Sequence, residues 1–175
     1  AVWIGFPSHA ELWQDDLEPA RAEVVAFARA VHADGRGERV ILVAADGEAA
    51  DAAERLAGDV ADVVVQPFGD IWLRDTGPIL LSATEGRSFG FNGWGGKYDL
   101  PGDDTLAGRL AETRGIAAPA CDWILEGGAI DGDGTGTVVT TEQCLLNPNR
   151  NPHLLRGDVE ARLAADLGLT RVVWL

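Results

Sequence analysis

The chain has 175 residues, of which 46% are hydrophobic, and it carries a formal net charge of −14 from 28 acidic and 14 basic residues. This length and composition suit one globular domain with a sizeable core. The negative charge argues against a nucleic-acid partner, whose phosphates require a basic surface, and no apolar run reaches the ~18 residues of a membrane helix. The charge is compatible with a small cationic partner, although an acidic surface also serves solubility alone.

Strand-like apolar segments alternate with helical patterns in the first part of the chain. Residues 2–7 (VWIGFP) are apolar, and residues 15–35 place apolar side chains three or four positions apart, which predicts an amphipathic helix. A strand at 39–45, an alanine-rich helix at 47–58 and a strand that begins at 59 or 62 follow, and Pro67 ends the regular pairing of the last.

The stretch GDIWLRDTGPILL at 69–81 has the pattern of a strand, a turn and a second strand. Polar or aromatic side chains occupy positions where a buried strand favours valine and isoleucine, namely Asp70, Trp72, Arg74 and Asp75. This departure marks the stretch as a candidate site.

The second part of the chain continues the alternation after an aromatic, glycine-rich stretch at 87–96. A helix is predicted at 103–115, with Asp103 or Asp104 as its N-cap and Gly115 as its stop. The remaining predictions are a hairpin of 122–130 with 137–146 around DGDGTG, a loop at 147–152, a helix at 157–168 and a strand at 171–175. The alternation predicts an α/β fold, with no visible sequence repeat.

Three other features of the sequence are weaker indications of a functional site. DGDGTGTVVTTE at 131–142 matches several positions of a calcium loop, but its flanks are strand-like, so a hairpin turn is favoured and no metal is expected. GFNGWGGKY at 90–98 departs from the phosphate-loop pattern. Cys121 and Cys144 are too few for a disulfide scaffold, and Cys144 is expected to be a small hydrophobe in a strand.

Two carboxylates, Asp75 and Glu126, stand in apolar surroundings. A buried carboxylate is costly unless it is paired, so either they bind a ligand or they have plainer roles. The plainer alternatives are a solvent-facing strand end for Glu126 and, for Asp75, an ion pair with Arg74 or a turn cap. With Trp72 and Trp94 near them in sequence, the pattern indicates a pocket for a guanidinium or amine, but it gives no reaction.

Five segments in this order, WIGFPS, FGDIWLRDTGP, FNGWGGKY, LEGGAID and TTEQCLLNPNRNP, resemble the agmatine deiminase / bacterial peptidyl-arginine deiminase family of the pentein superfamily. The resemblance implies an α/β fold that is part of a five-bladed propeller of ββαβ modules. It implies that Asp75 is catalytic and, with Glu126, clamps the substrate guanidinium, and that Trp72 lines the pocket. Arg74 is expected to make a structural ion pair. Trp94 is also expected to bind the substrate.

The resemblance also implies hydrolysis of a guanidine through a cysteine thiolate and a histidine. The family's GH-x-D-N segment and its C-terminal cysteine do not occur here, so residues 1–175 are expected to be the N-terminal portion of a single deiminase domain and inactive alone. The expected reaction converts agmatine to N-carbamoylputrescine and ammonia in polyamine biosynthesis.

Several alternatives remain open at this stage. They are a peptidyl-arginine deiminase, a non-catalytic module that binds a guanidinium or a polyamine, and a structural domain whose exposed strand edges pair with another chain. No cofactor is expected, and the partner is a small cationic guanidine. The absence of a visible secretory signal and the low cysteine content predict a cytoplasmic location, and self-association into a homo-oligomer is left open.

Overall fold

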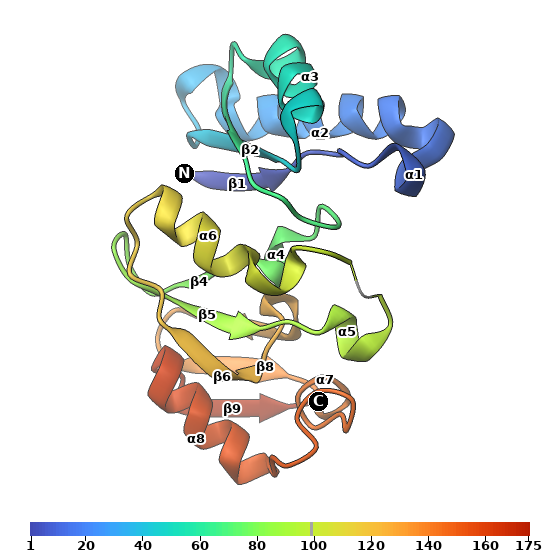
Figure 1. The fold of residues 1–175 in the computed structure, drawn as a ribbon. Coiled ribbons are helices and arrows are strands. Elements are labelled where there is room, and N and C mark those ends of the chain that lie inside the picture. The colour runs from blue at the N-terminus through green and yellow to red at the C-terminus, as the bar shows by residue number, and fades with distance from the viewer. Residues whose placement is uncertain (99) are drawn as a thin grey trace. The chain divides into compact units, whose positions relative to one another are not determined.

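The computed structural model describes residues 1–98 and 100–175, which form two compact units (Figure 1). The first unit holds Ala1–Leu73 and Leu100–Gly102, and the second holds the described residues of 74–99 and Asp103–Leu175. None of the described helices is long and apolar enough to cross a membrane.

The first unit is a parallel three-stranded sheet with helices in its crossovers. Its strands are β1 (Val2–Gly5), β2 (Val40–Ala44) and β3 (Ala61–Val65), in the order β1-β2-β3. Its helices are α1 (Ala10–Trp13), α2 (Leu17–His32) and α3 (Gly47–Ala57).

The core of the first unit forms where α2 and α3 pack against alternate residues of the sheet. Phe6, Val40 and Leu42 are fully or almost fully buried there. Small side chains let the helices approach closely, and α3 buries five alanines: Ala49, Ala50, Ala52, Ala53 and Ala57. The predicted helix at 15–35 is shorter as an α-helix, because its two ends form 3-10 turns at Gln14–Asp16 and Ala33–Gly35.

The second unit contains two further three-stranded sheets. The first is β4 (Ile79–Leu80), β5 (Gly86–Gly90) and β6 (Ala120–Ile124), and the second is β7 (Ile130–Gly132), β8 (Thr137–Thr140) and β9 (Arg171–Trp174). Its helices are α4 (Leu73–Thr76, starting in the first unit), α5 (Gly93–Gly96), α6 (Leu106–Thr113), α7 (Glu142–Leu145) and α8 (Arg156–Leu167).

Both sheets of the second unit have the same topology. In each, the first two strands are antiparallel, the third is parallel to the second, and a helix, α6 or α8, precedes the third strand. The order ββαβ therefore occurs twice, and the predicted α/β class is confirmed. The described residues form open sheets and no closed one.

An apolar core spans these two sheets and α8. Trp123 of β6 lies edge-on to Phe89 of β5, with 5.4 Å between ring centroids. The Trp123 indole N–H donates to Asp166 Oδ2 of α8 at 2.8 Å, which satisfies the polar end of an almost fully buried ring.

Three local predictions were wrong. Residues 69–72 form bends and no strand, and 73–76 form a helical turn. The predicted strand 122–130 is divided between β6 and β7, which belong to different sheets, because a turn at Gly127–Ala129 interrupts it. Cys144 lies in the helical turn α7, where the Thr141 side chain caps the Cys144 N–H.

Two turn predictions can be compared with the structure directly. The N-cap of α6 is Thr105, because Asp103 and Asp104 belong to the preceding 3-10 turn. Asp133 in the calcium-like segment accepts hydrogen bonds from Thr135 and Thr137 and closes the β7–β8 hairpin. These bonds explain a carboxyl pKa well below its usual range, and no group of His, Cys, Asp and Glu among the described residues is arranged to hold a metal.

Candidate functional site

The candidate site lies in the second unit, beyond the carboxyl ends of β5 and β6. Because these two strands are parallel, their carboxyl ends lie at the same edge of the sheet. The segment 91–98 leaves this edge after β5, and Glu126 follows β6. The short helix α4 supplies Asp75.

The Asp75 carboxylate is held by one donor on each oxygen. Its Oδ2 accepts a hydrogen bond from the Trp94 indole N–H at 3.0 Å, and its Oδ1 accepts one from the backbone N–H of Gly128 at 2.8 Å. A carboxylate can accept about four hydrogen bonds, so capacity remains on both oxygens. The orientation of the carboxylate is therefore fixed without using all of its acceptor sites.

Trp94 reaches Asp75 from a tightly turned backbone. Its own φ is 57°, and the adjacent glycines Gly93, Gly95 and Gly96 also have positive φ values. A side chain on Gly93 would lie 1.6 Å from the carbonyl oxygen of Tyr98, so only glycine fits there. Asn92 caps the turn by accepting from the Gly95 N–H at 2.9 Å. The glycine-rich segment thus serves to direct the Trp94 indole toward Asp75.

Glu126 is buried, with 3% of the residue exposed, which overturns the alternative of a solvent-facing strand end. Its Oε1 accepts a hydrogen bond from Arg150 Nε at 2.7 Å. Its Oε2 is also buried and has no hydrogen-bond partner within the described part of the chain. An unsatisfied buried carboxylate oxygen is unfavourable, so Glu126 Oε2 is a candidate acceptor for a donor from outside the described residues.

Arg150 was not predicted from the sequence as a site residue. It reaches Glu126 from a loop that side-chain hydrogen bonds hold in place. The Asn151 side chain bonds both the N–H and the carbonyl of Ile124 in β6, at 2.9 and 2.8 Å. Asn92 donates to the carbonyl oxygen of Asn149 at 2.9 Å. The available sequence signal was the segment NPNRNP at 147–152, in which asparagines flank the arginine. This segment does not indicate which residue the arginine contacts.

Asp75 and Glu126 occupy equivalent places in the two ββαβ segments. Each lies four residues before the first strand of its sheet, which begins at Ile79 in one case and at Ile130 in the other. The N–H of Gly128, two residues after Glu126, binds Asp75. This hydrogen bond joins the turn after Glu126 to Asp75, so the segments of the two predicted carboxylates form one cluster.

Arg74 has a different partner from the one predicted, and Trp72 belongs to the first unit. Arg74 donates to the carbonyl oxygen of Ile130 at 3.0 Å in place of the predicted ion pair. Trp72 belongs to the first unit, where 53% of the residue is exposed and its indole N–H donates to Asp70 Oδ2 at 2.8 Å. Asp70 also accepts from the Ile71 N–H, so it stabilises its own bend.

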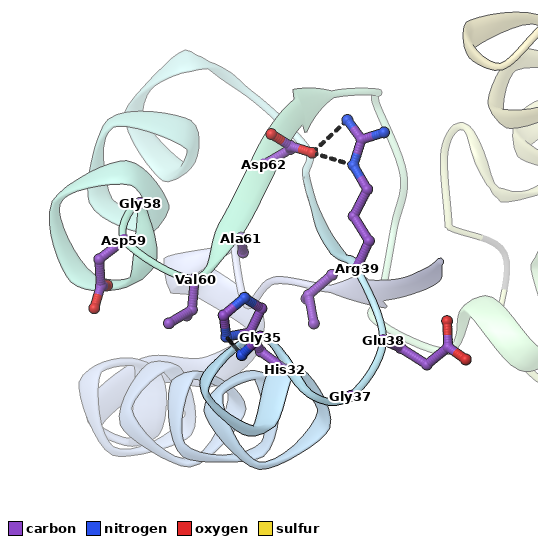
Figure 2. Close-up of a pocket in the computed structure, with 11 residues that line it drawn as sticks. His32, Gly35, Gly37, Glu38, Arg39, Gly58, Asp59, Val60, Ala61 and Asp62 are labelled. Carbon is purple, nitrogen blue, oxygen red and sulfur yellow. Dashed lines mark hydrogen bonds and ion pairs between the residues drawn. The ribbon is translucent and has the colours of Figure 1, made fainter.

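A separate hollow lies in the first unit, near the start of β2 and β3 (Figure 2). Arg39 and Asp62 form an exposed ion pair across it at 2.6 Å. Asp59, also on its rim, pairs with Arg29, and this hydrogen bond lowers the carboxyl pKa of Asp59. These carboxylates already have cationic partners and are exposed, so the hollow does not match the predicted guanidinium site.

Cys121 does not have the surroundings of an activated nucleophile. Burial, followed by the charge of Asp166, raises the pKa of the Cys121 thiol to about 11. A thiol of this pKa is protonated near neutral pH. Cys144 lies in α7 and is half-buried.

Comparisons with known proteins give the family. The model of the Porphyromonas-type peptidyl-arginine deiminase family matches residues 1–175. The agmatine deiminases of Pseudomonas putida and Pseudomonas aeruginosa are 38% and 36% identical to this chain, and each match covers 99% of this chain and 49% of the relative.

Solved structures of agmatine deiminases also resemble this chain. The agmatine deiminase of Enterococcus faecalis has a TM-score of 0.88 at 29% identity, with 99% of this chain and 49% of that one covered. A substrate-bound agmatine deiminase of C. jejuni has a TM-score of 0.86 at 28% identity, with 99% and 52% covered. The chain spans about half the length of the relatives it matches. On this evidence, the chain belongs to the Porphyromonas-type peptidyl-arginine deiminase family.

Proposed function

We propose that this chain supplies the guanidinium-binding carboxylates of a guanidine deiminase that converts agmatine to N-carbamoylputrescine and ammonia. The observation that carries the proposal is the cluster of Asp75 and Glu126, in which Glu126 Oε2 is buried without a donor among the described residues. A guanidinium N–H is a donor of the right charge and geometry for that oxygen.

In this proposal the two carboxylates hold the planar guanidinium of the substrate. Glu126 Oε2 accepts one N–H, and Asp75 uses the acceptor capacity left beside its bonds to Trp94 and Gly128. The Trp94 ring adds an aromatic face that attracts a cation, and a substrate-binding role for Trp72 stays a prediction. The clamp fixes the guanidinium carbon for attack, and Asp75 is the catalytic carboxylate because it contacts the reacting group.

The chemical step needs a thiolate and a proton carrier besides the clamp. Cys121 is a protonated thiol near neutral pH, and the family's motifs for the nucleophile and the histidine do not occur among the 175 residues. The chain is therefore proposed to be the N-terminal portion of a single deiminase domain, with its ββαβ segments forming part of a propeller.

We expect this chain alone to bind agmatine without turnover. An assay for ammonia, with the 175-residue protein and excess agmatine, should give no release above the protein-free reaction. Ammonia release in proportion to protein would contradict the assignment of the chemistry.

The family's description favours one second candidate, a peptidyl-arginine deiminase. Arginine within a peptide presents the same guanidinium, so the same carboxylates would serve it. The two substrates differ beyond the guanidinium, because agmatine ends in a free amine. An arginine-containing peptide that binds more tightly than agmatine would favour this candidate.

Calorimetric titration tests the proposed clamp. Agmatine should bind the protein, and Asp75→Asn and Glu126→Gln should each weaken binding about tenfold or more, because each removes a charge-assisted hydrogen bond. Asp59→Asn is the matched control, since Asp59 is an exposed carboxylate already paired with Arg29, and it should leave binding unchanged.

Two results would contradict the clamp. One is unchanged affinity in both carboxylate variants. The other is equal affinity for agmatine and for putrescine, a diamine without a guanidinium, because the carboxylates would then not recognise the group that the proposal assigns to them.

A further inference from the structure

We propose that Arg150 is a positioning residue, which keeps the Glu126 carboxylate ionised and turned so that Oε2 is offered to the substrate guanidinium. This inference rests on the proposed function, and it assigns a role to a residue of the NPNRNP loop that carried none in the sequence.

The first support is the burial of the pair. Only 4% of the Glu126 side chain and 13% of the Arg150 side chain are exposed, and the Nε–Oε1 distance is 2.7 Å. A carboxylate removed from water to this degree becomes neutral unless an opposite charge lies beside it. Arg150 supplies that charge and remains protonated at any ordinary pH.

The second support is that the pair occupies only one oxygen of Glu126. Oε1 accepts from Arg150, whereas Oε2 is buried without a hydrogen-bond partner in the residues that the structure describes. A fixed bond to one oxygen orients the carboxyl group and leaves the other as an acceptor. A neutral carboxyl group could place a proton on Oε2 and would then repel a donor.

The third support is that Arg150 also contacts the turn that positions Asp75. A Cβ on Gly95 would lie 3.0 Å from Arg150 Nη1, so the guanidinium lies against the backbone next to Trp94. The Trp94 indole in turn donates to Asp75. One cation therefore bonds one proposed carboxylate and lies next to the turn whose indole bonds the other.

The charges around Glu126 determine what its removal would do. Arg150 pairs with Glu126 directly, Asp75 is joined to the following turn through Gly128, and Arg74, which donates to Ile130, lies beside Gly127. Without Arg150, the burial of Glu126 favours its protonated form. The carboxyl pKa of Glu126 should then rise.

The first test is a pH titration of the Glu126 carboxyl carbon by NMR in the isotopically labelled protein, with Glu126→Gln used to identify the signal. In Arg150→Gln the titration should move to higher pH by about three units or more, which leaves Glu126 mostly protonated at about pH 6.5. Arg150→Lys retains a cation beside Glu126, so it is the conservative variant if Arg150→Gln fails to fold. It should keep the Glu126 carboxyl group ionised at neutral pH.

The second test is agmatine binding between about pH 6.5 and 8.5, where the wild-type affinity should be flat. Arg150→Gln should bind about tenfold more weakly at the lower pH and recover as the pH rises, because deprotonation of Glu126 restores the acceptor. Arg150→Lys should keep the flat profile. A purely structural role for Arg150 would not produce this difference in pH dependence.

Arg162→Gln is the matched control, because Arg162 pairs with Asp122, whose side chain is exposed, and its loss should leave the Glu126 titration and the binding profile unchanged. An unchanged Glu126 titration in Arg150→Gln would overturn the inference, as would a flat binding profile in that variant. Absence of agmatine binding by the wild-type protein would instead refute the proposed function, and the ligand-free NMR titration would still decide whether Arg150 keeps Glu126 ionised.

Discussion

Glu126 and Asp75 could be selected from the sequence because a carboxylate in an apolar segment is an anomaly that packing does not explain. Trp94 could be associated with them by its neighbouring glycines, and its indole does contact Asp75. Arg150 could not, because its partner lies 24 positions away and nothing local indicates the pair.

Arg74 shows the limit of reasoning from neighbours in sequence. An arginine beside an aspartate predicts an ion pair, yet Arg74 reaches the carbonyl oxygen of Ile130, and Asp75 accepts from Trp94 and Gly128. Adjacent residues in a helical turn do not face each other, so the two side chains diverge. Long-range contacts, which the sequence does not show, therefore decide the partners of both charged groups.

At the scale of elements, most boundaries were predicted because apolar periodicity is strong in β2, α3, α6 and α8. Two of the failures fall at the site. Residues 73–76 form a helical turn, and Gly127–Ala129 forms a 3-10 turn that separates β6 from β7. Short turns of this kind have no period, so apolar sequence on both sides suggested continuous strands.

The turn after Glu126 leads to a prediction for Gly128→Ala. An added Cβ would lie 2.3 Å from Asp75 Oδ1, the oxygen that the Gly128 N–H binds. The carboxylate must then move, so agmatine binding should weaken about tenfold or more, and the free energy of unfolding should fall by about 1–3 kcal/mol. Calorimetry and urea denaturation measure the two effects.

Gly108→Ala is the matched control for that variant. Gly108 lies within α6, and a Cβ there has nothing within 4 Å. Alanine is a better helix former than glycine, so the free energy of unfolding should rise by about 0.5–1 kcal/mol with agmatine affinity unchanged. Equal loss of binding in both variants would show that the site does not depend on the Gly128 contact.

For the whole molecule, the α/β class followed from the alternation of segments, but the internal organisation did not. The contacts divide the chain into two compact units, and the ββαβ order recurs in the second without a visible sequence repeat. The two ββαβ segments share a short pattern, with a carboxylate four residues before the first strand and a glycine two residues after that carboxylate. A topology can recur with little shared sequence, because burial and turn geometry constrain only a few positions.

The net charge of −14 belongs to the same scale. This charge creates an electrostatic field that attracts a cation such as agmatine, and salt screens that field. The field does not identify a binding site. Binding of the guanidinium at Asp75 and Glu126 is tested by a measurement that reports where agmatine binds as well as how tightly it binds.

Titration of the nitrogen-15-labelled protein with agmatine, followed by NMR, is that measurement. The Trp94 indole N–H and the Gly128 backbone N–H both bind Asp75, so both signals should shift with agmatine and remain in place with putrescine. The Trp123 indole N–H, which binds Asp166 in α8, should not shift with either compound. Signals of Trp94 and Gly128 that stay unchanged at saturating agmatine would contradict the account.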